Sequence, residues 1–506
     1  MSAVQTGPRE RLLITIAVMS ATIMQVLDTT IVNVALPHMQ GQLSATRDQI
    51  SWVLTSYLVA SGIFMPLTGY FTDRLGQKRY LMLSVAGFVV SSALCGLSTN
   101  VAEIVIFRLA QGVFGAALVP LSQSLMVNTY PLEQRGRAMA IWGMGVMIGP
   151  ILGPTLGGYL TEVLSWRWTF YINVPVGMLS LLLAWRVVPD TERRERRMDW
   201  TGFLLMGLAI GTVQYVLDRG NEDAWFSSNT ITLLSAIAVV SFIAFIVHAV
   251  RAGDHAIFRL GIFRDRNFTT ASLLIAVFGL GLYGTALVQP LMLEGLLSYP
   301  ALTTGLVMAP RGLASMFSMM LVGRLIGRID PRILIATGIV LASTGAWAMT
   351  LYSLDIDIYW SVWPIVLQGL GMGLIFVPMS TVAFSSLPPR DSAEAAGLFS
   401  LLRTIGSSIG ISIVSTVLTR HTQMAWNQLG GHITDMNPAV DDYLRGLGMG
   451  VHSPAAPQLL GQLLHRQADM VGFLDAFLLI TWGFLIMLPL VLLMRRVDLG
   501  RRAPGR

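Results

Sequence analysis

The sequence predicts an all-α polytopic membrane protein with fourteen transmembrane helices. Its 506 residues are 54% hydrophobic and only 12% charged, whereas a soluble globular domain has about 25% charged residues. Apolar stretches of about 20 residues, the length that a helix needs to cross a hydrocarbon core of ~30 Å, recur along the whole chain. The fourteen predicted helices begin near Leu12, Ile50, Tyr80, Ala102, Arg137, Thr169, Thr201, Thr230, Phe268, Thr303, Ile333, Tyr359, Ala393 and Val471.

The distribution of basic residues orients these helices. Of the 34 lysines and arginines, 25 fall in one alternating set of connecting segments, which includes both termini. Six fall in the other set, and three (Arg108, Arg311 and Arg403) lie inside predicted helices. Since cytoplasmic segments carry the excess of lysine and arginine, we expect both termini in the cytoplasm.

The same composition excludes several kinds of site. Cys95 is the only cysteine, so neither an internal disulfide nor a cysteine metal cluster is possible, and we expect no metal site. The basic residues line membrane-flanking segments and face anionic lipid, so we expect the lipid bilayer and no nucleic acid as a partner.

An internal repeat predicts how the helices are grouped. The turn Gly69–Arg79 matches Gly323–Arg332, since both are rich in glycine and arginine and hold one aspartate. The pair Gln111-Gly112 likewise matches Gln368-Gly369, each followed by a Val-Pro step. In both matches the helix number is shifted by eight.

This shift predicts two six-helix halves around two inserted helices. We place the first half at residues 1–198, the inserted helices at 199–255 and the second half at 256–506. Paired six-helix halves are a common plan of secondary transporters, with the substrate site at the bilayer midplane between them. Residues 420–470, rich in glycine, proline and histidine, are predicted as one large external loop.

Several motifs in this order resemble the fourteen-helix drug:proton antiporter branch of the major facilitator superfamily, over essentially the whole chain. The motifs are Leu27–Pro37, Gly69–Arg79, Arg108–Gly112, Gly149–Gly158, Asn173–Pro175, Leu217–Gly220 and Trp225–Ser228. The resemblance implies the major facilitator fold and proton-driven efflux of amphipathic drugs across a bacterial inner membrane. It also implies a periplasmic membrane-fusion adaptor and an outer-membrane channel as partners, protons as the coupling ion, and no other cofactor.

Asp28 and Arg108 are the predicted proton-coupling residues. A carboxylate inside a membrane helix is costly and usually marks an ion or proton path. At ~1.5 Å per residue, Asp28 lies about 13 Å and Arg108 about 9 Å from the outer ends of their helices. The resemblance implies that these two helices touch, so the two residues can pair. Burial favours the neutral acid and a guanidinium favours the carboxylate, so their separation could couple proton release to conformation. The alternatives are a static ion pair and a neutral aspartic acid that only packs helices.

Four further residues are candidates for substrate binding or coupling: Glu294, Arg311, Glu394 and Arg403. The two arginines are predicted to hold anionic groups or one of these carboxylates. The alternative is that they snorkel to the interface or cap carbonyl groups.

The predicted fifth helix carries glycines every four residues, at Gly145, Gly149, Gly153 and Gly157, beside Pro150, Pro154 and Gly158. A four-residue period of small side chains lets another helix approach closely. We interpret this ridge as a gating seam, and plain close packing is compatible with it.

The cytoplasmic turn after the second helix is predicted to gate the transporter. The resemblance implies that it latches the cytoplasmic side through ion pairs, whereas a mere positive anchor is the alternative. The turn residues are Gly69, Asp73, Arg74, Gly76, Lys78 and Arg79.

The sequence argues against an enzyme. A GxGxxG match at Gly279–Gly284 lies inside a membrane helix with no strand before it, so a dinucleotide site is not expected. The only lysine, Lys78, is followed by Arg79 rather than Ser or Thr, so no P-loop exists. Two functions other than multidrug efflux remain open: dedicated export of one metabolite, siderophore or fatty acid, and a non-transporting membrane receptor or scaffold.

Overall fold

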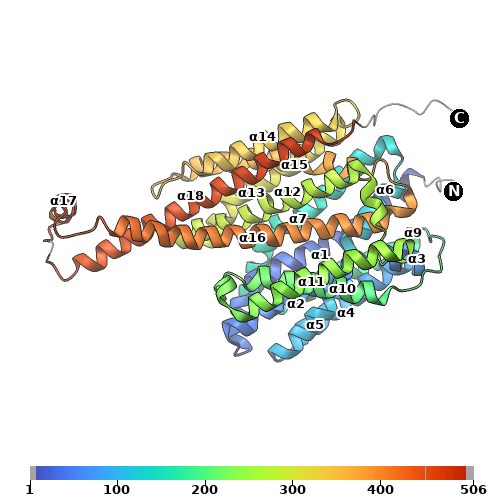
Figure 1. Ribbon diagram of the computed structural model, residues 1–506, viewed down its shortest axis with the longest axis horizontal. Coiled ribbons are helices and arrows are strands. Elements are labelled where there is room, and N and C mark those ends of the chain that lie inside the picture. Colours follow the sequence, from blue (N-terminus) through green and yellow to red (C-terminus); the bar gives the residue numbers. More distant parts are fainter. Residues whose placement is uncertain (1–6, 451, 497–506) are drawn as a thin grey trace.

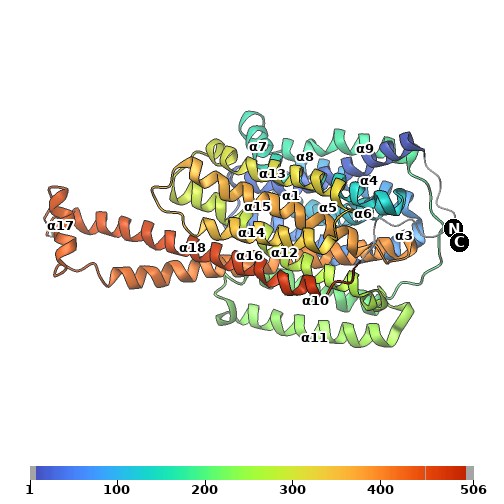
Figure 2. The same cartoon turned by 90° about the horizontal axis from the view of Figure 1, so that it is seen from above.

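The computed structural model describes residues 7–450 and 452–496. Fourteen helical segments within these ranges are long and apolar enough to cross a membrane, which confirms the predicted fold class. They run side by side along the long axis of the molecule (Figure 1). α1 begins and α18 ends at the same end of the bundle (Figure 2), as an even number of spans requires. We call this the terminal end, and the opposite end the arm end.

The first half comprises the six spans before residue 188. They are α1 (Pro8–Gln42), α2 (Arg47–Phe64) continued by η1 (Met65–Leu67) and α3 (Thr68–Leu75), α4 (Gln77–Leu97), α5 (Val101–Gly115) with α6 (Leu118–Thr129), η2 (Leu132–Gln134), α7 (Arg135–Val163), and α8 (Trp168–Tyr171) with α9 (Asn173–Val187). Local chemistry sets the ends: the Asn100 side chain accepts from the Glu103 amide and caps α5. Gly76, at φ 84°, separates α3 from α4 in a conformation that glycine adopts freely.

The two helices in the predicted insertion pack differently, and the first of them lies against both halves. They are α10 (Trp200–Arg219) and α11 (Asn229–Ala252), followed by η4 (Gly253–His255) and η5 (Leu260–Arg264); η3 (Trp225–Ser227) joins them. On one side of α10, Arg219 donates to the Ser51 hydroxyl of α2 at 2.6 Å. On the other, Gln214 donates to Ser408 of the second half at 2.8 Å. α11 forms an outer layer (Figure 2), and its exposed large apolar side chains suit contact with lipid.

The second half comprises six spans after residue 265. They are α12 (Arg266–Pro290) with the π-turn η6 (Leu291–Leu296), α13 (Ala301–Leu325), α14 (Pro331–Met349), α15 (Ile358–Ala383), η7 (Pro389–Asp391) with α16 (Ser392–Gly430), and α18 (Ala456–Leu492), with the short α17 (Pro438–Gly446) before α18. The isolated bridge Ile326–Ile329 marks the tight turn after α13.

The segment 420–470, predicted as an external loop, is largely helical, so the prediction of a loop is wrong. α16 continues to Gly430, and α18 begins at Ala456 rather than near Val471. These helices have 39 and 37 residues, so at ~1.5 Å per residue each is more than 50 Å long, against a hydrocarbon core of ~30 Å. They project together beyond the other helices with α17 at the tip (Figures 1 and 2). The polar composition that indicated a loop belongs to helices that leave the apolar layer.

The projecting parts of α16 and α18, with α17 between them at the tip, form what we call the arm. The two long helices contact each other along it. His421 Nδ1 lies 2.7 Å from Asp475 Oδ2, and the rings of Trp426 and His465 lie 5.7 Å apart. The arm is therefore a paired helical hairpin and not two independent extensions.

Candidate functional site

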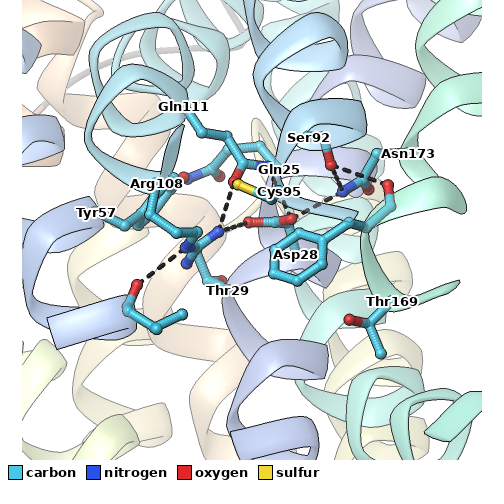
Figure 3. Close-up of polar contacts among 12 residues, drawn as sticks. Gln25, Asp28, Thr29, Tyr57, Ser92, Cys95, Arg108, Gln111, Thr169 and Asn173 are labelled. Atoms are coloured by element: carbon cyan, nitrogen blue, oxygen red, sulfur yellow. Dashed lines mark hydrogen bonds and ion pairs between the residues drawn. The ribbon is translucent and has the colours of Figure 1, made fainter. Parts of the chain in front are cut away.

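Asp28 and Arg108 form a buried ion pair between α1 and α5. Arg108 Nη1 lies 2.6 Å from Asp28 Oδ2, and neither side chain is more than 1% exposed. Figure 3 shows the guanidinium directed at the carboxylate across the gap between the two helices. The predicted pairing, made from helix depth and from the helix contact that the family resemblance implies, is confirmed.

Two amides complete the surroundings of the carboxylate. Gln111 Nε2 donates to Asp28 Oδ1 at 2.9 Å, and Asn173 Nδ2 donates to the same oxygen at 2.8 Å. Asn173 also donates to Ser92 Oγ at 2.9 Å, which fixes its orientation (Figure 3). An ionised carboxylate only accepts hydrogen bonds, so three donors from α5 and α9 match its ionised form.

Arg108 has several further partners besides Asp28. Its Nε donates to the backbone oxygen of Val53 at 3.0 Å, and its Nη1 also donates to Gln111 Oε1 at 2.7 Å. The Tyr57 ring lies under the guanidinium at 4.3 Å, and Gln25 donates to the Tyr57 hydroxyl at 2.9 Å. A cation over an aromatic face gains electrostatic stabilisation that strengthens when water is excluded.

Sequence reasoning assigned no role to Gln111, Asn173 or Tyr57. A signal did exist for Gln111, which follows Arg108 by three residues and therefore shares its helix face. No such spacing points to Asn173 or Tyr57, because Asn173 reaches Asp28 from α9 and Tyr57 reaches Arg108 from α2.

The second half repeats one hydrogen bond of this site without its charges. Gln368, the repeat match of Gln111, donates to the Thr285 hydroxyl of α12 at 2.9 Å. Thr285 thus receives the bond that Asp28 receives in the first half. Ile365 stands where Arg108 would lie in the repeat. Among the described residues, the second half therefore has no counterpart of the Asp28–Arg108 pair.

The other two predicted membrane arginines are not paired with the predicted carboxylates. Arg311 is 8% exposed and donates to Gln289 Oε1 at 3.2 Å. Arg403 is partly buried on α16 and forms no ion pair with a described residue. Glu294 is exposed in η6, at the arm end.

Glu394 instead lies in the first turn of α16, at the terminal end, so its suggested pairing with Arg311 or Arg403 is wrong. It is 2% exposed, and its Oε2 lies 2.9 Å from Arg259 Nη2. Arg259 also lies 2.6 Å from Asp391. Burial alone would lower the pKa of the Arg259 guanidinium, but Glu394 and Asp391 raise it above its ordinary value. The arginine therefore stays charged and holds the start of α16.

The turn at 69–79 joins the same network. Arg196, from the segment between the halves, lies 3.4 Å from both Asp73 Oδ2 and Glu394 Oε2. A Cβ placed on Gly69 would lie 2.6 Å from the Glu394 Cβ, so only glycine lets α3 and α16 approach this closely. Ser124 and Ser392, one from each half, also share a hydrogen bond of 2.8 Å. The two halves are thus joined at the terminal end.

The remaining turn residues lie outside this junction. Arg74 donates to the Tyr70 hydroxyl at 2.6 Å, and Arg79 lies 3.9 Å from Asp190. Gly76 packs against Asp190. Lys78 forms no side-chain hydrogen bond or ion pair with a described residue.

The glycine ridge of α7 packs against α1, the helix that carries Asp28. A Cβ on Gly149 would lie 2.9 Å from the backbone carbonyl of Val26, and one on Gly157 would lie 3.0 Å from the Ile31 oxygen. Gly145 and Gly153 meet side chains of α1 in the same way, whereas Gly158 faces open space. Pro150 and Pro154 occur within the continuous helix. Close packing is confirmed, and the gating role stays a prediction.

The fourteen-span bundle with a buried acid–base pair defines a polytopic membrane transporter. Residues 18–411 match the Major Facilitator Superfamily. The chain therefore belongs to this superfamily of membrane transporters.

Similar proteins agree with this assignment over nearly the whole chain. The chain is 35% identical over 478 residues to the multidrug export protein EmrB of Haemophilus influenzae, covering 94% of each protein. It is 34% identical over 482 residues to the fatty acid resistance protein FarB of Neisseria gonorrhoeae, covering 94% of this chain and 95% of FarB. The solved structure of the proton:xylose symporter XylE shares the fold, with a TM-score of 0.61 at 13% identity over 94% of this chain and 95% of XylE.

Proposed function

We propose that this protein exports structurally varied amphipathic drugs across a bacterial inner membrane in exchange for protons. The observation that carries the proposal is the fully buried Asp28–Arg108 pair at 2.6 Å. A membrane carboxylate with a buried basic partner is the kind of group that binds and releases a coupling proton. The similarity to EmrB supports multidrug export as the activity.

The exchange uses Asp28 in two protonation states. The ion pairs of Glu394 with Arg196 and Arg259 keep the terminal end closed. In this state a proton from the outer side binds the Asp28 carboxylate and cancels its charge. Arg108 keeps its contacts to Val53 and Gln111, so it stays in place while α1 is released from the ion pair. α1 then moves along the glycine ridge of α7, and the re-formed ion pair expels the proton to the cytoplasm.

The orientation and partners follow from the same proposal. The arginine-rich terminal end faces the cytoplasm, so the arm projects into the periplasm. A periplasmic membrane-fusion adaptor docks on the arm and links the transporter to an outer-membrane channel. The length of α16 and α18 beyond the bilayer supports this docking.

A narrower function has one specific observation in its favour, the similarity to FarB. A dedicated fatty acid exporter would rescue a hypersusceptible host from fatty acids alone. A multidrug exporter would rescue it from several unrelated compounds, and a protonophore would abolish this rescue.

The test of coupled export uses purified protein in proteoliposomes. An imposed pH gradient is expected to drive uphill drug movement with opposite proton movement. Absence of proton-linked flux from well-folded protein would contradict the proposal and favour a receptor or scaffold.

A further inference from the structure

Three arginines of the described chain are buried to more than 90%: Arg108, Arg219 and Arg311. Arg108 pairs with Asp28, and Arg219 lies 2.9 Å from Glu222. Arg311 has no carboxylate within 4.0 Å among the described residues, and its partner is the neutral Gln289. A buried charge without an opposite charge is strongly destabilising, so this arginine calls for an explanation.

The position of Arg311 rules out escape to the membrane surface. It is ten residues from the start of α13, so at ~1.5 Å per residue it lies about 15 Å deep, near the middle of a ~30 Å core. Leu306, Leu313 and Phe317 form the exposed face of α13. Arg311 lies on the opposite face, with the buried Val307. It therefore points into the protein at the depth where transporters bind substrate.

The internal repeat shows what is missing beside Arg311. Tyr57 and Arg311 each precede the first glycine of the matched turns, Gly69 and Gly323, by twelve residues. In the first half, Tyr57 lies under the guanidinium of Arg108, which neutralises Asp28. In the second half a cation, Arg311, therefore occupies the repeat position that Tyr57 occupies in the first half.

No carboxylate of a described residue accompanies Arg311 as Asp28 accompanies Arg108. Thr285 receives the glutamine hydrogen bond that Asp28 receives in the first half. The second half has thus kept a buried guanidinium and replaced the carboxylate by a hydroxyl group.

We infer that Arg311 and Gln289 bind the anionic headgroup of an amphipathic substrate, a carboxylate on an apolar body. Among the described residues, the Gln289 amide donates only to Met349 Sδ, at 3.6 Å, and a thioether is a weak acceptor. Its N–H and the planar donor fork of Arg311 can both turn to a carboxylate, which arginine recognises bidentately. The inference rests on the proposed export function and names the substrate class of that function.

The test compares two probes of the same shape and opposite charge, 2-naphthoate and 2-naphthyltrimethylammonium. Their equilibrium binding is measured by calorimetry on full-length protein in phosphatidylcholine nanodiscs. Arg311→Gln is expected to weaken naphthoate binding about tenfold or more, the effect of losing a hydrogen bond to a charged group. It should leave binding of the cation within about twofold, and Arg311→Lys should be intermediate.

Three outcomes would overturn the inference: naphthoate does not bind the parent, Arg311→Gln leaves its affinity unchanged, or well-folded Arg311→Gln loses both probes equally. Repeating the titration with phosphatidylglycerol in the discs separates a lipid phosphate from a substrate. If phosphatidylglycerol competes with naphthoate, the site binds lipid headgroups, and the inference that it binds a substrate carboxylate is contradicted. Because the assay measures binding, failure here is distinct from failure of proton-linked flux in proteoliposomes.

Discussion

Asp28 Oδ2 lies 2.6 Å from Arg108 Nη1, and the bond joins α1 to a guanidinium that is itself fixed on α5 and α2. The two partners are therefore unequal. Arg108 has a backbone acceptor in Val53 and an aromatic ring in Tyr57 that do not depend on Asp28, and Gln111 bridges the two charged residues. The carboxylate is the member of the pair that can change state while the arginine remains in place.

Arg108→Lys should reduce coupling more than conservation of charge suggests. Arginine bonds Asp28, Gln111 and Val53 at the same time through its planar fork, and a lysine ammonium cannot reproduce that geometry. The measurement is the ratio of protons to drug moved in proteoliposomes. Folded Arg108→Ala protein with the parent rate and ratio would refute a role of the pair in coupling.

Gly149→Ala should destabilise the protein and slow transport. The new methyl group would lie 2.9 Å from the Val26 backbone, which cannot move aside without shifting α1. Overpacking of this kind costs about 1–3 kcal/mol. Gly158→Ala is the matched control, because its methyl group meets nothing within 4 Å. The measurements are the midpoint of thermal denaturation and the drug flux of both variants. Equal midpoints and equal fluxes would disprove the close-packing role of Gly149.

Glu394→Gln should open the terminal end. The amide removes the charge that Arg196 and Arg259 share, so the junction between the halves weakens. A single cysteine at Ala140, which packs against Gly323 of the other half, reports the opening by maleimide labelling in a Cys95→Ser background. Labelling should rise several-fold, whereas Asp441→Asn on the distant α17 should leave it unchanged. No rise with Glu394→Gln would mean that the network is not a latch.

Replacing residues 431–455 by a short flexible linker should impair whole-cell resistance and spare drug/proton exchange in proteoliposomes. The removed segment holds α17 and the tip of the arm but no part of the membrane bundle. Minimum inhibitory concentrations and flux are compared for the same variant. Equal loss in both assays would assign the arm to the transport fold rather than to adaptor docking.

The sequence is sufficient to predict features that depend on a single helix. The number of spans and the four-residue glycine period are properties of single helices, and the structure agrees with them. The helix ends differ more, because α1 continues to Gln42 and α18 begins at Ala456. The amide donors from Gln111 and Asn173 were missed because they depend on which helices face one another. The sequence places Glu394 at the start of its helix, but the pattern of one helix does not show that Arg196 and Arg259 from other segments pair with it. The arm does not follow from hydropathy, because a helix that leaves the bilayer loses its apolar character without losing its helical structure.

Proton-driven transport by Asp28→Asn protein tests the central claim most directly. Asparagine keeps the size and polarity of the side chain but cannot bind and release a proton. Parent and variant are reconstituted side by side, a pH gradient is imposed, and drug and proton movements are followed together. The account predicts that the folded variant loses uphill drug transport and coupled proton flux, while binding of a neutral drug survives. Full uphill transport by Asp28→Asn protein would contradict it and exclude Asp28 as the essential proton carrier.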